Sequence, residues 1–319
     1  MTLSIIRKIG LTTLLTTATS LPLISNADSN IHISGAAEIE ATAVEKEGSD
    51  ITLATLALVV DAKINEKSQV TLVALHEDDD TEEFVIDEAI ININIGNGFT
   101  VTAGRMYVPF GNFETNMISD PLTLEIAETQ EAAIKIEFEK NSLSASLYAF
   151  NGEAEKTNGT RDKIDDFGIN LNYAFENLNF GVGYINNIAD TDTFQDPATT
   201  ISEQDAGLAL HVIFNANQFD AIFEHITALD KLDNGTEPAA SNIEFGYHLG
   251  ETTIALGYQS TDELAGVFSE QKTLLSYSTA ISKDTALAIE YSNSQDYSVI
   301  NGGLDTSIDT LTAQLAVEF

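Results

Sequence analysis

Sixteen segments of alternating residue types, separated by connections that are alternately short and long, constrain the fold of this 319-residue chain. In the last of them, Thr310–Phe319, apolar side chains alternate with mostly polar ones. A period of two places successive side chains on opposite faces of a β-strand. Segments 88–95, 165–175 and 243–249 repeat the pattern, with polar residues on one face and aliphatic or aromatic residues on the other. The sequence therefore predicts an all-β protein.

The connections indicate how these strands are joined. The short ones are small polar turn sequences, at residues 65–68, 96–98, 140–141, 176–177, 215–217, 250–251 and 283–284. The long ones centre near residues 47, 79, 119, 159, 196, 234, 263 and 302. This alternation is typical of outer-membrane barrels, in which tight turns face the periplasm and long loops face outside. Because strands joined by hairpins must close their edges, we predict a transmembrane antiparallel β-barrel of about 16 strands.

The N-terminal residues 1–27 have the features of a cleaved secretory signal peptide. Arg7 and Lys8 form a basic start, residues 10–24 are largely apolar, and residues 25–27 are small. No later segment has about 18 consecutive apolar residues, so no transmembrane helix is predicted. We therefore expect one barrel domain over residues 28–319, located in the bacterial outer membrane with both termini in the periplasm.

The apolar face of the last strand ends on the aromatic Phe319. Such a strand resembles the assembly signal of outer-membrane barrels, which implies the barrel assembly machinery as a partner. Outer-membrane lipid and lipopolysaccharide are expected around the barrel, and a homotrimer is plausible for sixteen strands.

The net charge is extreme, with 14 basic and 50 acidic residues and a formal charge of −36. Such a surface attracts cations and repels anions, which excludes nucleic acid as a partner. Cysteine is absent from the sequence, so disulfides and thiolate chemistry are excluded. No spacing pairs a nucleophile with a base, and we predict neither an enzyme, a cofactor nor a metal site. The acidic segment 76–83 lacks the glycine of a calcium loop and is interpreted as a solvated extracellular loop.

A barrel of about sixteen strands leaves an aqueous channel that its own side chains cannot fill. The third long connection, residues 105–129, is too apolar for a solvated loop. Its segment 119–121 reads as a helix start. We predict that this connection folds inward and narrows the channel; packing on the rim or between subunits is the alternative. The predicted constriction residues are Pro109, Phe110, Gly111, Phe113, Glu114, Asp120, Glu125 and Glu128.

The acidic residues of this connection would make the narrow zone negative, as acidic rings do in cation channels. The charged residues expected to face the lumen from the strands are Lys63, Lys135, Glu88, Asp166 and Glu244. The two lysines either form a basic path opposite the acidic loop or pair with neighbouring carboxylates. The second interpretation is favoured.

The stretch Tyr107–Glu125 resembles the LbtU-type siderophore porins, as do segments 50–54 and 87–89 more weakly. The element from Gly104 to Gly111 more distantly resembles the phosphate-selective porins of the O/P kind. The first resemblance implies an outer-membrane porin that gives ferric siderophore a passive, TonB-independent passage.

Three functions are therefore expected: a siderophore porin, a general cation-selective diffusion porin for small cationic solutes, or a non-conducting structural or adhesin barrel. Many siderophores are polycarboxylates, and an acidic lumen would repel their anionic complexes. The ferric complex is then neutral or positive, or Lys63 and Lys135 provide a local basic path.

Overall fold

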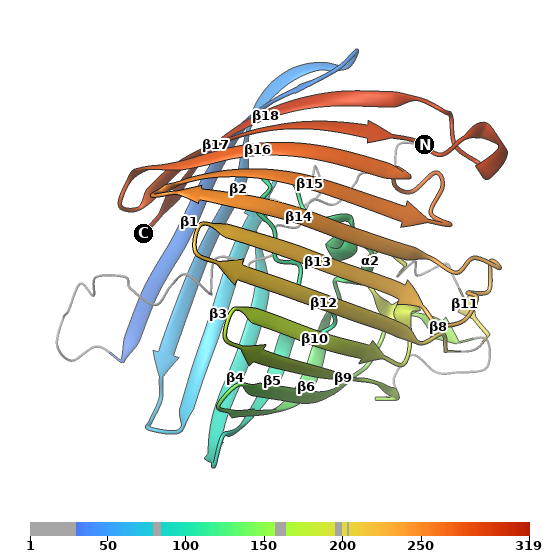
Figure 1. Ribbon diagram of the computed structural model, residues 1–319. Coiled ribbons are helices and arrows are strands. Elements are labelled where there is room, and N and C mark those ends of the chain that lie inside the picture. Colours follow the sequence, from blue (N-terminus) through green and yellow to red (C-terminus); the bar gives the residue numbers. More distant parts are fainter. Residues whose placement is uncertain (1–29, 79–83, 157–163, 195–199, 203) are drawn as a thin grey trace.

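The computed structural model describes residues 30–78, 84–156, 164–194, 200–202 and 204–319. Sixteen antiparallel strands form a closed barrel around a lumen that contains one short helix (Figure 1). This confirms the predicted fold class and its strand number. None of the helices in the described ranges is long and apolar enough to cross a membrane.

The barrel strands follow one another around the wall in chain order. They are β1 (Ile31–Val44), β2 (Gly48–Lys63), β3 (Ser68–Glu77), β4 (Val85–Gly96), β5 (Phe99–Tyr107), β6 (Gln130–Lys140), β7 (Leu143–Phe150), β9 (Asp166–Phe175), β10 (Leu178–Ile185), β12 (Gly207–Ala216), β13 (Phe219–Ala228), β14 (Ala239–Leu249), β15 (Thr252–Asp262), β16 (Gln271–Ser282), β17 (Thr285–Gln295) and β18 (Ser307–Glu318). Two further strands, β8 (Glu155–Lys156) and β11 (Thr200–Ile201), pair with each other in parallel outside the barrel wall.

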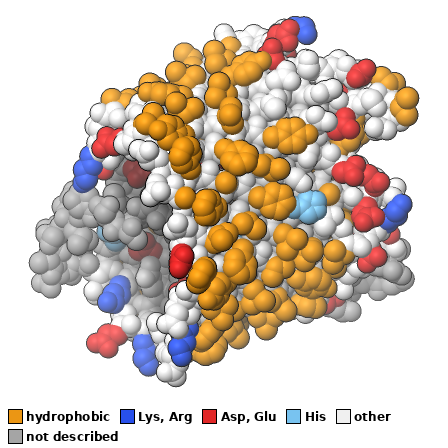
Figure 2. Space-filling model, viewed as in Figure 1, with side chains coloured by type: hydrophobic (Ala, Val, Ile, Leu, Met, Phe, Trp, Pro, Cys, Tyr) orange, Lys and Arg blue, Asp and Glu red, His pale blue; other side chains and the backbone are white. Residues whose placement is uncertain are grey.

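Alternation along each strand separates a lipid face from a lumen face, as the sequence predicts. On β4, Ile91, Ile93 and Ile95 are exposed on the outside, whereas Glu88 and Asn92 are partly covered on the inside. Figure 2 shows hydrophobic side chains over much of the outer face, most densely over its lower central part in this view. Because lipid tails replace water there, these exposed apolar residues are stable on the surface of the barrel.

Tight turns at one end set the register of the hairpins. The turn between β4 and β5 places Asn97 and Gly98 at φ 56° and 86°. Asn141 and Asn217, in two other turns, also have positive φ near 55°. Two-residue hairpin loops require such left-handed conformations, which asparagine and glycine tolerate best. The predicted short connections therefore lie together at one end of the barrel.

The barrel closes where β1 pairs with β18, so the sheet has no free edge. Ala36 lies opposite Glu318, and Gly35 and Phe319 exchange backbone hydrogen bonds of 2.9 and 3.0 Å. Phe319 packs so closely on Gly35 that a Cβ there would lie 2.6 Å from the ring. Both described ends of the chain thus lie at the end of the barrel that carries the short turns.

Candidate functional site

The third long connection folds into the lumen, as the sequence predicts. We call residues 108–129 the inner loop. It contains helix α2 (Leu122–Ala127), which begins directly after Pro121, the helix start expected from the sequence. Proline fits this place because its missing N–H would have no partner in the first turn. Helix α2 lies against the lumen side of β13, β14 and β15.

Apolar side chains bind both ends of the inner loop to the wall. Phe110 and Ile126 are 1% and 0% exposed and belong to one buried cluster with wall residues that include Tyr148, Ile185 and Ile226. The cluster fills part of the barrel beside β6–β14. Burial of such side chains stabilises a structure by about 1.5–3 kcal/mol each, so this shared cluster anchors the inner loop to the barrel wall.

The polar backbone of the inner loop is bound by carboxylates that project from the wall. Glu224 on β13 is 2% exposed and accepts hydrogen bonds from the backbone N–H groups of Asn112 and Phe113, at 2.6 and 3.1 Å. It also accepts one from the Thr123 hydroxyl at 2.8 Å. One buried carboxylate thereby binds both the segment at Asn112 and Phe113 and the helix of the inner loop.

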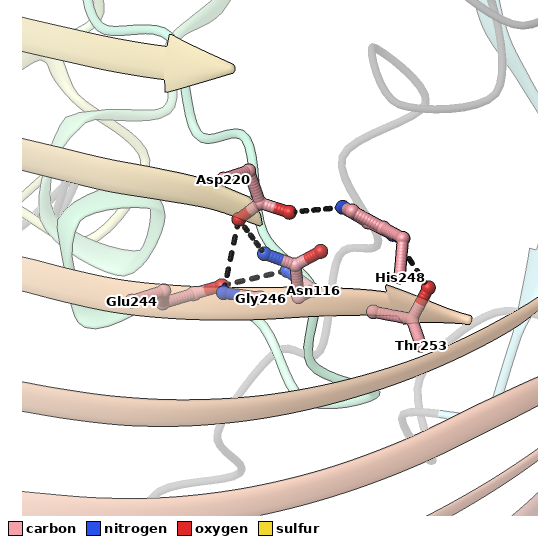
Figure 3. Close-up of polar contacts among 6 residues, drawn as sticks. All are labelled: Asn116, Asp220, Glu244, Gly246, His248 and Thr253. Carbon is pink, nitrogen blue, oxygen red and sulfur yellow. Dashed lines mark hydrogen bonds and ion pairs between the residues drawn. The ribbon is translucent and has the colours of Figure 1, made fainter. Parts of the chain in front are cut away.

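The next carboxylates along the wall hold the tip of the loop (Figure 3). Glu244 on β14 accepts hydrogen bonds from the Thr115 hydroxyl at 2.6 Å and the Asn116 backbone N–H at 2.7 Å. The Asn116 side-chain amide donates to Asp220 at 2.9 Å. Asp220 also contacts His248 Nε2 at 2.5 Å, so the tip is joined to a polar network on β13 and β14.

A third wall carboxylate, Glu290 on β17, continues the series. It accepts hydrogen bonds from the backbone N–H groups of Ile118 at 2.6 Å and Ser119 at 3.3 Å, and from the Ser119 hydroxyl at 2.7 Å. Lys272 on β16 donates to the same hydroxyl at 2.8 Å. Hydrogen bonds to a charged acceptor are roughly twice as strong as neutral ones. The inner loop is thus fixed against β13–β17.

A second loop covers the inner loop and binds its helix. The segment after β10 begins with the 3₁₀ turn η2 (Ile188–Asp190). The Thr191 hydroxyl donates to the Ile126 carbonyl at 3.0 Å, and the Asp192 N–H donates to the Glu128 carbonyl at 2.8 Å. These bonds satisfy carbonyls at and just beyond the C-terminus of α2 that have no partner within the helix.

A pair of buried aspartates supports this covering loop. Asp190 in η2 and Asp166 at the start of β9 are 1% and 3% exposed. Burial, and then the carboxylate of Asp166, raise the pKa of Asp190 to about 7. Ala154 donates its N–H to Asp190 at 3.0 Å, and the Asn187 amide donates at 2.7 Å. Protonation of Asp190 therefore favours the observed packing of the covering loop.

The lumen wall on the other side, formed by β18 and β1–β6, is also acidic. Its lumen-facing carboxylates are those of Glu38, Glu40, Asp61, Glu77, Glu88, Glu131, Glu137, Glu139 and Glu318. The lysines on the same described faces are Lys63 and Lys135. Lys135 Nζ lies 2.9 Å from Glu137 Oε2, so this lysine is paired with a neighbouring carboxylate.

The structure separates the predicted constriction residues into two groups. Phe110 and Glu128 are buried, and Pro109 and Glu125 are partly covered, near the wall and the covering loop. Gly111 and Phe113 form a turn in which both residues have positive φ, 100° and 58°.

The other two charged residues of the predicted constriction, Glu114 and Asp120, lie near the tip of the inner loop. Both are partly buried, as are Pro109 and Glu125. Burial, together with the carboxylates of Asp220 and Glu244, raises the pKa of Glu114.

The predicted wall charges are more widely spread than the constriction residues. Lys63, Lys135 and Glu88 face the lumen from the wall opposite the inner loop, Glu244 binds the loop, and Asp166 supports the covering loop. Part of the acidic segment predicted as a solvated loop, residues 79–83, lies outside the described residues.

Sequence reasoning missed the residues that fix the inner loop from across the barrel. Glu224, Glu290 and Asp220 occupy lumen-facing positions, and strand alternation would have found them there. Glu224 and Glu290 accept hydrogen bonds from backbone N–H groups of the inner loop, and Asp220 accepts one from the Asn116 side-chain amide. These partners are more than 100 residues away, so the contacts have no local signal in the sequence.

A closed sixteen-stranded barrel with an apolar outer face and an inward loop belongs to the class of outer-membrane channels. The chain belongs to the Gram-negative porin family, whose model matches residues 12–297. This membership places the barrel in the outer membrane.

Two curated relatives carry names that state no function. The chain is 27% identical over 234 residues to a UPF0422 protein of Coxiella burnetii, covering 64% of this chain and 50% of that protein. It is 25% identical over 329 residues to UPF0422 protein lpp3030 of Legionella pneumophila strain Paris, covering 85% and 62%. The chain thus spans between half and two thirds of the length of these relatives.

Solved porins share the fold at low sequence identity. The anion-selective porin of Comamonas acidovorans matches with a TM-score of 0.66 and 12% identity, covering 92% of this chain and 100% of that one. The outer-membrane channel DcaP of Acinetobacter baumannii matches with a TM-score of 0.66 and 11% identity, covering 93% and 99%. The trimer form of OmpT of Vibrio cholerae gives 0.61 and 12%, covering 92% and 100%. Such identities show a common fold alone.

Proposed function

We propose that this protein is a passive outer-membrane channel that admits cations and neutral solutes and disfavours anions. The observation that carries the proposal is the sign of the charge on both sides of the lumen. Glu114 and Asp120 lie near the tip of the inner loop, and the wall opposite presents many carboxylates against Lys63 and Lys135. Because carboxylates lie on both sides of the lumen, their potentials add and stabilise a cation inside it. A lumen with acidic residues on one side and basic residues on the other would instead have an electric field across the channel.

Ferric siderophore is the finer proposal for the cargo. The resemblance of Tyr107–Glu125 to the LbtU-type siderophore porins supports it, together with passage that needs no TonB coupling. An acidic lumen restricts this cargo to ferric complexes that are neutral or positive, unless Lys63 and Lys135 provide a local basic path. General diffusion of small cations is the second candidate, and the acidic wall favours it directly.

The orientation of the barrel and its surroundings are further parts of the proposal. The short turns and both termini would face the periplasm, and the long loops would face outside. The terminal strand with Phe319 would be read by the barrel assembly machinery, and lipopolysaccharide would contact the outer rim.

The distribution of aromatic residues supports a homotrimer. Strands β18, β1, β2, β3 and β4 lie side by side and contain no Phe or Tyr, whereas each of the other barrel strands has at least one. Aromatic side chains mark the lipid interface of a membrane barrel. A continuous face without them therefore fits contact with another protein surface, and a second copy of this chain is the proposed occupant.

The test is single-channel conductance of the refolded protein in a planar bilayer under a salt gradient, with and without a ferric siderophore. The expected result is a cation-selective current. Partial block by a neutral or positive ferric siderophore would support it as cargo, whereas indifference would favour general diffusion. An anion-selective current would contradict the proposed selectivity. No current from a verified folded barrel would favour the structural or adhesin function.

A further inference from the structure

A histidine lies in the polar network that holds the tip of the inner loop (Figure 3). His248 on β14 bonds to both neighbouring strands: its Nε2 lies 2.5 Å from Asp220 Oδ2 on β13, and its Nδ1 lies 3.0 Å from the neutral Thr253 hydroxyl on β15. These two contacts fix the orientation of the ring. The His248 side chain is 40% exposed, whereas that of Asp220 is 7% exposed. The ring can therefore exchange protons with water in the lumen.

Asp220 connects this histidine to the inner loop. Its Oδ2 contacts His248, whereas its Oδ1 accepts hydrogen bonds from the Asn116 side-chain amide at 2.9 Å and from the Gly246 N–H at 3.1 Å. Because these partners use different oxygens, a charged His248 does not compete with Asn116 for Asp220. A change of charge on the histidine therefore acts on the tip of the loop through one shared carboxylate.

The titratable groups around this pair are acidic, and they come from each side. Asp220 projects from β13, Glu244 from β14 and Glu114 from the inner loop, where the last senses the charges of the other two. Asp220 binds the side-chain amide of Asn116 while Glu244 binds its backbone N–H, so two carboxylates meet at one residue. Like charges at short distance repel each other. A protonated His248 offsets the charge of Asp220 and weakens this repulsion, which a neutral ring does not.

Histidine is the side chain whose charge ordinarily changes between about pH 5 and 8. We propose that His248 and Asp220 form a pH-sensitive clamp that holds the tip of the inner loop more firmly as pH falls. A firmer tip reduces the fluctuations of current through the lumen. This effect on current rests on the proposed channel function, whereas the clamp itself does not depend on conduction.

The test measures the mobility of a nitroxide spin label at the tip by electron paramagnetic resonance, with the refolded barrel in lipid vesicles. Cysteine is absent from the sequence, so Ile118→Cys supplies a single labelling site at a partly buried position of the tip. The ratio of mobile to immobile label should rise by about two- to fivefold between pH 5.5 and pH 8, the range set by a partly exposed ion pair.

Substitutions of His248 separate the clamp from a general loss of structure. His248→Gln keeps a polar side chain that takes no charge, so the label should lose its pH dependence. His248→Lys carries its charge at both pH values and should keep the label immobile at pH 8, which a misfolded barrel cannot produce. The matched control is His225→Gln on the outer face of β13, where His225 Nδ1 contacts the Ser241 hydroxyl at 2.8 Å. This control should respond to pH as wild type does.

The outcomes distinguish the clamp from the channel. A pH response that persists in His248→Gln, or a wild-type label that does not respond to pH, would overturn the clamp. A label that responds as expected in a folded barrel without cation current would support the clamp and contradict the proposed function. A cation current from a barrel whose label is indifferent to pH would support the channel and overturn the clamp.

Discussion

Glu114 is a titratable residue near the tip of the inner loop whose environment alters its charge. Its pKa is raised by burial and by the carboxylates of Asp220 and Glu244. As pH falls, Glu114 therefore loses its charge at a higher pH than an ordinary glutamate. The cation selectivity that we propose for the channel should weaken over the same range.

Glu114→Gln should reduce the ratio of potassium to chloride permeability at neutral pH by roughly two- to threefold. The measurement is the reversal potential under a salt gradient between pH 4 and 8. The variant should have a flatter pH profile than wild type. Glu47→Gln, in the exposed β1–β2 turn, is the control, and a profile of Glu114→Gln identical to that of wild type would contradict the role of this residue.

Gly104 is the residue at which backbone conformation and close packing coincide. It combines φ 141° with a Cβ position 2.0 Å from the Ala89 carbonyl oxygen. Gly104→Ala should lower the free energy of unfolding by roughly 1–3 kcal/mol or more, measured by urea titration in lipid vesicles. Gly183→Ala is the matched control, because its Cβ would meet its nearest neighbour at an ordinary 3.4 Å. Equal stability of the two variants would contradict the prediction.

At the scale of elements, the inner loop depends on carboxylates from the wall. Glu290→Ala removes the acceptor for the N–H groups of Ile118 and Ser119. Each hydrogen bond to a charged group contributes roughly 1.5–3 kcal/mol, so the tip of the loop should move more. We expect larger open-channel current fluctuations, which Glu290→Gln, with one acceptor oxygen left, should partly suppress. Unchanged current noise in Glu290→Ala would show that the hydrogen bonds to Glu290 are not needed to hold the tip of the loop.

The covering loop has a pH dependence of its own through Asp190. Its pKa is about 7 in the folded protein, above the ordinary aspartate value of 3.8. The stabilisation that this difference provides is fully present below pH 3.8 and is lost as pH rises through about 7. Protection of residues 186–194 from hydrogen exchange, corrected for the intrinsic rate, should therefore fall over this range.

Asp190→Asn should flatten this dependence, because the amide has no charge to gain and can still bond to Asn187 or Ala154. Hydrogen exchange of a barrel strand such as β13 serves as the control within the same sample. A variant that keeps the wild-type pH dependence would assign the effect to another group.

The elements themselves were largely predictable from the sequence, because strand alternation and turn residues are local signals. The helix start before Leu122 was equally local. The partners of the inner loop were not predictable, since each wall carboxylate reads as a polar lumen residue whether or not a loop binds it. Glu224 and Glu290 bind the inner loop only in the closed barrel, which brings residues more than 100 positions apart into contact.

At the scale of the whole molecule, the sign of the lumen charge is independent of the fold. A porin named as anion-selective shares this barrel at 12% identity and a TM-score of 0.66. Ion selectivity therefore depends on the side chains that face the lumen. In this sequence acidic residues outnumber basic ones, 50 to 14. For the same reason, the composition predicts a preference for cations but does not identify the transported solute.

The proposed homotrimer leads to a prediction about the outer face of β18 and β1–β4. Ala41 on β1 is exposed, faces outward and pairs with Ala313 and Ile51 on the neighbouring strands. Small side chains let two protein surfaces approach closely, so Ala41→Trp should separate subunits and lower the trimer fraction in mild detergent. Leu147→Trp, on the outer face of β7 among lipid-facing residues, should leave that fraction unchanged.

Light scattering coupled to size-exclusion chromatography measures the outcome directly. A wild-type mass of three chains that falls to one chain in Ala41→Trp would locate the interface on this face. A wild-type mass of one chain would contradict the homotrimer, and the aromatic-free face would then need another occupant. A trimer that withstands Ala41→Trp but not Leu147→Trp would place the contact on the opposite side, because a lipid-facing tryptophan alone does not disrupt a membrane barrel.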